Sequence, residues 1–207
     1  MPPIDTESIL DAVKNRLSAN ASHTAHALWG PACELWLNAE VRAALNEGDL
    51  VPKGCFVGGE ERYPTPGDLR RPDILIHEIA EDRKTDYPCQ VIEAKALYPW
   101  HNSRMKSQLL DLRKQLLAAR KRLPHAAVLG LIYVVHIPAM RRDCPRPSYF
   151  YNIVEPMLQN VFKAKTYSLR SQRLQTIAEA IATNGRLPEG SHFESSVSFA
   201  MTYVVRR

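Results

Sequence analysis

The stretch "CQVIEAKAL", residues 89–97, combines an apolar run typical of a buried strand with two charged residues, Glu93 and Lys95. Charged side chains are almost never fully buried unless something pairs with them. Because side chains alternate along a strand, Glu93 and Lys95 project from one face and Ala94 from the other. The same D/E-x-K spacing recurs at residues 82–84, but that segment is polar and its charges need no explanation. The run at 89–97 therefore predicts a buried strand whose end holds two candidate functional residues, Glu93 and Lys95.

A second strand is predicted just upstream, at "PDILIHEI", residues 72–79, which is rich in aliphatic and β-branched residues. A short polar segment joins the two runs, which favours an antiparallel pair. In such a pair Asp73, at the start of the first strand, lies beside Glu93 and Lys95 at the end of the second. Two carboxylates and a strand carbonyl form a hard oxygen site that suits Mg²⁺ or Mn²⁺.

A helix that begins near Pro31 and ends near Gly48 is predicted to bring a further carboxylate to this edge. At 100° per residue, Glu34 falls within about 40° of the apolar stripe that faces the core. Glu40 falls on the far side of the helix with Trp36. We rank Glu34 ahead of Glu40 and leave the choice between them open.

The rest of the chain alternates predicted helices with apolar strands. Helices are expected at residues 6–19, 102–123, 151–163 and 168–183, and strands near residue 55, at 126–137 and at 198–205. This order predicts one domain over residues 1–207, a three-layer α/β/α sandwich around a mixed central sheet. Its core spans about residues 31–136, and C-terminal helices with a last strand fill residues 150–207.

Charge is unevenly distributed along the chain, whose formal net charge is +5. Residues 1–100 hold 10 Lys/Arg and 16 Asp/Glu, whereas residues 101–147 hold 10 and 2. A basic segment directly after an acidic half favours a polyanionic partner, although a solvated basic face would have the same composition. The four cysteines lack metal-ligand spacing, and the N-terminus lacks the pattern of a signal peptide. No apolar run is long enough to span a bilayer, so we expect a cytoplasmic protein without a membrane partner.

The segments "RPD", residues 71–73, and "VIEAK", residues 91–95, resemble the motif of the PD-(D/E)xK nuclease superfamily, whose best-known members are restriction endonucleases. The resemblance covers residues 31–136 and implies a restriction endonuclease-like fold and a metal-dependent phosphodiesterase. By the family pattern, Asp73, Glu93 and the Ala94 carbonyl would hold Mg²⁺ or Mn²⁺. Lys95 would orient or deprotonate the attacking water. Glu34 would serve a second metal or a water on it, and Gln108 would lie near the phosphate.

The substrate implied by the resemblance is nucleic acid, DNA rather than RNA, within a defence, repair or mobile-element system. Basic residues near the site are candidates for phosphate contact: Arg71, Arg104, Lys106, Arg113 and Lys114. The chain could act as a homodimer or in a larger protein complex. Two alternatives stay open: a catalytically silent nuclease-like subunit that binds nucleic acid or a partner protein, and a structural α/β protein in which E-x-K is a coincidence.

Overall fold

The computed structural model describes residues 4–20, 23, 24, 27, 33–47, 50–58, 71–80, 86–97, 102–136, 147–162, 168–174 and 199–206. The helices are α1 (Thr6–Ala19), α3 (Cys33–Glu47), α4 (Asn102–Arg122) and α5 (Pro147–Val161). The strands are β1 (Cys55–Gly58), β2 (Ile74–Ile79), β3 (Asp86–Leu97), β4 (Ala127–His136), β5 (Ser168–Leu174) and β6 (Phe199–Arg206). These bounds confirm the predicted helices at 6–19 and 102–123 and the predicted strands at 72–79, 89–97, 126–137 and 198–205.

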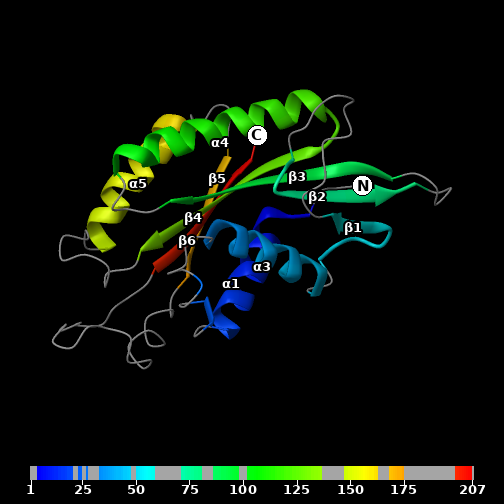
Figure 1. The fold of residues 1–207 in the computed structure, drawn as a ribbon, viewed down its shortest axis with the longest axis horizontal. Helices are drawn as coiled ribbons and strands as arrows, with labels where there is room; N and C mark the ends of the chain where they lie inside the picture. Colours follow the sequence, from blue (N-terminus) through cyan, green and yellow to red (C-terminus); the bar gives the residue numbers. More distant parts are fainter. Residues whose placement is uncertain are drawn as a thin grey trace.

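The strands form one mixed sheet in the order β1-β2-β3-β4-β6-β5. β1, β2 and β3 are antiparallel neighbours, as the polar connection between β2 and β3 predicted. β3 and β4 are parallel, and α4 is the crossover between them, because parallel strands cannot be joined by a tight turn. β6 runs antiparallel to β4 and to β5 (Figure 1).

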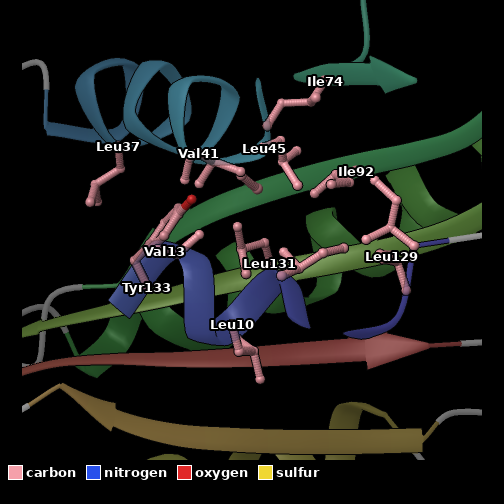
Figure 2. Close-up of a cluster of buried hydrophobic side chains, with 14 of the residues drawn as sticks. Leu10, Val13, Leu37, Val41, Leu45, Ile74, Ile92, Leu129, Leu131 and Tyr133 are labelled. Carbon is pink, nitrogen blue, oxygen red and sulfur yellow. The ribbon is translucent and has the colours of Figure 1, made fainter. Parts of the chain in front are cut away.

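Helices cover both faces of the sheet (Figure 1). One face packs against α1 and α3, and its buried core includes Leu10, Leu37, Ile92 and Leu131 (Figure 2). The opposite face packs against α4 and α5 through a second cluster that includes Val91, Leu97, Leu112 and Leu158. The sheet therefore has a separate hydrophobic core on each face, which accounts for its almost continuously apolar central strands.

The two helices of the first layer are tied together at their surface. Asp5 caps the start of α1 by accepting hydrogen bonds from the N–H groups of Glu7 and Ser8, both at 3.1 Å. Arg16, near the end of α1, pairs with Glu40 of α3 at 2.5 Å and also contacts Glu47. These ion pairs join α1 to α3, while the apolar side of α3 is buried against the sheet.

α4 buries one apolar face and exposes a basic one. Its buried positions are Met105, Leu109, Leu112, Leu116 and Ala119, which is the stripe expected from the sequence. Basic side chains follow its outer surface and crowd its last turn at Arg120, Lys121 and Arg122. Within the described residues, no helix has both the length and the apolarity needed to cross a membrane.

One predicted element is wrong. Residues 168–174 form the strand β5 instead of the start of a helix over 168–183, and residues 175–183 lie outside the described part. β5 is an outer strand that pairs with β6 along its whole length, from Ser168 opposite Arg206 to Leu174 opposite Ala200. Local periodicity cannot reveal this pairing, because ladder bonds to a distant strand override the weak intrinsic preference of a short polar segment.

Candidate active site at the end of the β2–β3 hairpin

The candidate site lies where β3 continues past the start of β2. Ile74, the first residue of β2, is opposite Ile92, whereas β3 continues to Leu97. The last residues of β3 are therefore paired with β4 on one side only. Backbone N–H groups on the other side need acceptors, because an unpaired buried amide is costly.

Two carboxylates supply these acceptors. The N–H of Ala94 donates to Asp73 Oδ2 at 2.7 Å, and the N–H of Ala96 donates to Glu34 Oε2 at 2.8 Å. Residues two apart on a strand lie about 7 Å from each other. Asp73 from the start of β2 and Glu34 from the first turn of α3 are thus held side by side along one strand edge.

Lys95 lies between these two anchored positions in the sequence. Its Nζ contacts Glu34 Oε1 at 2.8 Å, so the two carboxylate oxygens of Glu34 bind the lysine and the neighbouring strand amide. The side chains of Lys95 and Glu34 are 24% and 33% exposed, so the pair is open to solvent. The Lys95 ammonium is thereby held beside the Glu34 carboxylate at a partly exposed edge of the sheet.

Glu93 is the buried member of the constellation, with only 4% of its surface exposed. Ala94 belongs to the core on the α1–α3 face, whereas Val91 and Leu97 belong to the core on the α4 face. By strand alternation Glu93 and Lys95 share the α4 face, which confirms the predicted separation from Ala94. A carboxylate this deeply buried needs an ionic or hydrogen-bonding partner, or a metal.

Of the two candidate carboxylates on α3, Glu34 is the one that reaches the edge of β3. Glu34 binds Lys95 and the Ala96 amide, whereas Glu40 faces the other way and pairs with Arg16 of α1. Gln108, on α4, has a buried Oε1 that accepts no hydrogen bond from the described residues. No described contact joins Gln108 to Asp73, Glu34 or Lys95.

One residue of this region was not predicted. Tyr133 of β4 lies opposite Ala96 in the parallel pairing and has no exposed surface. Burial raises the pKa of its hydroxyl well above that of an ordinary phenol, and the negative charges of Asp73, Cys33 and Glu34 raise it further. The only sequence signal was a phenol inside the otherwise aliphatic run of residues 126–135.

The predicted phosphate contacts differ in their surroundings. Arg71, Arg104 and Lys106 are exposed, whereas Lys114 pairs with Asp111 of its own helix at 2.9 Å. Arg113 is half-buried and, with Lys106, lines a cavity of about 560 Å³ between α4 and α5. Leu110 of α4 and mostly apolar side chains of α5 complete this cavity.

The residues present fit a hard divalent cation in their donor chemistry. In a strand, the N–H and C=O of one residue point toward the same neighbour, so the Ala94 carbonyl faces the edge where Asp73 lies. Among the described residues, no group of three or more His, Cys, Asp or Glu is arranged as a metal site. Mg²⁺ does not require such a group, because it is commonly held by one or two carboxylates with water in its other positions.

No protein-family model matches the sequence, and no curated protein or solved structure is significantly similar to the chain.

Proposed function

We propose that the chain is a metal-dependent nuclease that hydrolyses phosphodiester bonds, with a restriction endonuclease-like arrangement of its core. One observation carries the proposal: Asp73 and Glu34, from two separate segments, bind the Ala94 and Ala96 amides on the edge of β3 that extends past β2, and Glu34 also pairs with Lys95 of the E-x-K segment. Carboxylates with one ammonium at a solvent-accessible edge are the groups that phosphoryl transfer in water requires.

The order of elements supports the same reading. A helix, three antiparallel strands, a crossover helix and a parallel strand follow one another as α3, β1, β2, β3, α4 and β4. This is the core that the resemblance to PD-(D/E)xK nucleases implies. The motif segments at residues 71–73 and 91–95 lie at the two strand ends where that core would carry its site.

Each residue has a role that its position allows. Asp73, Glu93 and the Ala94 carbonyl would hold Mg²⁺ or Mn²⁺, which would acidify the attacking water and offset charge on the phosphoryl oxygens. Lys95 orients the attacking water and stabilises the negative charge that develops on phosphorus. Glu34 holds the Lys95 ammonium at 2.8 Å and anchors it to the strand, which fixes the direction of its N–H groups.

The partner in this proposal is nucleic acid, DNA rather than RNA. α4 begins within a few residues of the end of β3 and exposes Arg104 and Lys106 on its first turns. Basic groups close to a carboxylate site can bind the phosphates that flank the scissile bond. A homodimer or a larger defence, repair or mobile-element complex is part of the same proposal.

A catalytically silent, nucleic acid-binding subunit is the second candidate, and one observation favours it. The carboxylates of Asp73 and Glu34 already satisfy the Ala94 and Ala96 amides, and Glu34 also neutralises Lys95. Such contacts satisfy the backbone amides at the end of β3 whether or not the chain catalyses a reaction.

Cleavage assays separate the two candidates. Supercoiled plasmid, linear DNA and RNA are incubated with the purified chain in Mg²⁺, Mn²⁺ or EDTA, alongside Glu93→Gln and the control Glu78→Gln. Glu78 lies on β2, at the end of the hairpin away from Asp73. The proposed nuclease cleaves with metal but not with EDTA, retains activity as Glu78→Gln and loses it as Glu93→Gln. Binding to DNA without cleavage under any metal condition would instead support the silent subunit.

A further inference from the structure

Tyr133 combines complete burial with a hydroxyl that has no hydrogen-bond partner among the described residues. The residue has no exposed surface, and its oxygen forms no hydrogen bond with the described residues. Figure 2 shows the ring among the side chains of the α1–α3 core, between α1 and α3. Buried tyrosine hydroxyls nearly always have a hydrogen-bond partner, so an exception needs an explanation.

The surroundings of this hydroxyl connect it to the candidate site. In the β3–β4 pairing Tyr133 is opposite Ala96, whose N–H is bound by Glu34. The charges that raise the pKa of Tyr133 are, after the effect of burial, those of Asp73, Cys33 and Glu34. The phenol therefore lies beneath the strand edge on the α1–α3 face, whereas Glu93 and Lys95 project on the α4 face.

Burial and the charges of Asp73, Cys33 and Glu34 raise the pKa of this phenol, so the hydroxyl keeps a proton that it can donate in a hydrogen bond. Asp73 is the first of the charged groups that act on it, and a carboxylate has room for several hydrogen bonds. Asp73 Oδ2 accepts the Ala94 amide, and Ala94 lies two residues before Ala96, the partner of Tyr133 in the sheet.

We propose that Tyr133 is a positioning residue that donates a hydrogen bond to the Asp73 carboxylate when the site holds a divalent cation. The inference rests on the proposed function, because it assigns Asp73 to that cation. Outer partners of this kind fix the orientation of ligating carboxylates, and their loss commonly weakens metal binding about 10- to 100-fold.

Tyr133→Phe tests the proposal because it removes one oxygen and keeps the ring. The matched control is Tyr87→Phe, which removes a phenol oxygen from a half-exposed position near the start of β3. Both variants and the wild type are unfolded thermally in EDTA, and their affinities for Mn²⁺ alone are measured by calorimetric titration.

We expect Tyr133→Phe to unfold in EDTA at the wild-type temperature or above, since it loses a hydroxyl that has no partner there. Its affinity for Mn²⁺ should fall about 10- to 100-fold, while Tyr87→Phe should bind like the wild type. A lower unfolding temperature in EDTA would mean that the hydroxyl has a structural partner, and this overturns the proposal. Equal Mn²⁺ affinities for Tyr133→Phe and wild type also overturn it while leaving the proposed function intact, whereas a wild type that binds no Mn²⁺ removes both.

Discussion

Asp73 Oδ2 accepts the backbone N–H of Ala94 at 2.7 Å, and this contact joins the residue just before β2 to the part of β3 that extends past β2. The proposed metal ligand is therefore also the acceptor that satisfies a strand amide. Function and stability can be separated at Asp73, because an amide side chain can keep the hydrogen bond while losing the charge.

Replacement of Asp73 by Ala should destabilise the chain by roughly 1–3 kcal/mol, since the Ala94 amide loses its acceptor. Asp73→Asn should cost much less, because its side-chain oxygen can accept the same N–H. Metal-dependent cleavage should be lost in both variants. Urea unfolding in EDTA measures the difference, and equal stability of the two variants would contradict the assigned contact.

Divalent cations should raise the unfolding temperature of the wild type, because they bind the folded site and relieve repulsion between its carboxylates. At a concentration of about 100 times Kd, the stabilisation expected from mass action is roughly 2.7 kcal/mol. Glu93→Gln should reduce the response to Mn²⁺ strongly, whereas Glu78→Gln should keep it. A thermal-shift titration checks this, and identical curves for wild type and Glu93→Gln would remove Glu93 from the metal site.

The Glu34–Lys95 pair should contribute little to stability by its charge alone. Both side chains are partly exposed, and ion pairs of this kind contribute about 0–1 kcal/mol. Glu34→Gln keeps an oxygen for the Ala96 amide, so we expect it to unfold close to wild type in urea while cleavage slows markedly. Glu34→Ala should be the less stable variant. A Glu34→Gln variant with normal cleavage would show that the orientation of Lys95 does not depend on the charge of Glu34.

The basic residues of α4 should contribute unequally to the affinity for DNA. Arg104→Gln or Lys106→Gln should each weaken DNA binding and reduce the slope of log affinity against log salt by about 0.9. Lys114→Gln should have a smaller effect, because Lys114 already pairs with Asp111. Lys14→Gln, on the exposed side of α1, is the control and should leave the slope unchanged. An unchanged slope in Arg104→Gln and Lys106→Gln would mean that this face is only solvated.

Gly130 of β4 leaves little room for a side chain, because a Cβ there would lie 3.0 Å from Leu116 Cδ1 of α4. Gly130→Ala should cost roughly 1–3 kcal/mol through overpacking. Gly130 is also opposite Glu93 in the sheet, so a shift of α4 should reduce cleavage as well. The added cost should vanish in a Leu116→Ala background, and urea unfolding of the double mutant checks whether the two positions are coupled.

Local pattern was enough to predict the hairpin and the two strand ends that form the site. Alternation predicted that the side chains of Glu93 and Lys95 lie on the opposite face of β3 from Ala94. The short polar connection predicted the antiparallel pair of β2 and β3, which brings Asp73 to the same edge. The buried stripe of α4 followed from its helical period in the same way. These features depend on residues that are near one another in the chain. The backbone geometry of a strand or helix then determines the direction in which each side chain projects.

Long-range packing decided three features: the contact of Glu34 with Lys95, the strand β5 and the burial of Tyr133. Glu34 contacts Lys95 across 61 residues of sequence, whereas Glu40 of the same helix pairs with Arg16 of α1. The strand at 168–174 exists through its ladder with β6, and Tyr133 acquires its buried, unpartnered hydroxyl from helices packed over β4. No periodicity encodes such relationships, because their free energy arises only when distant segments exclude water together.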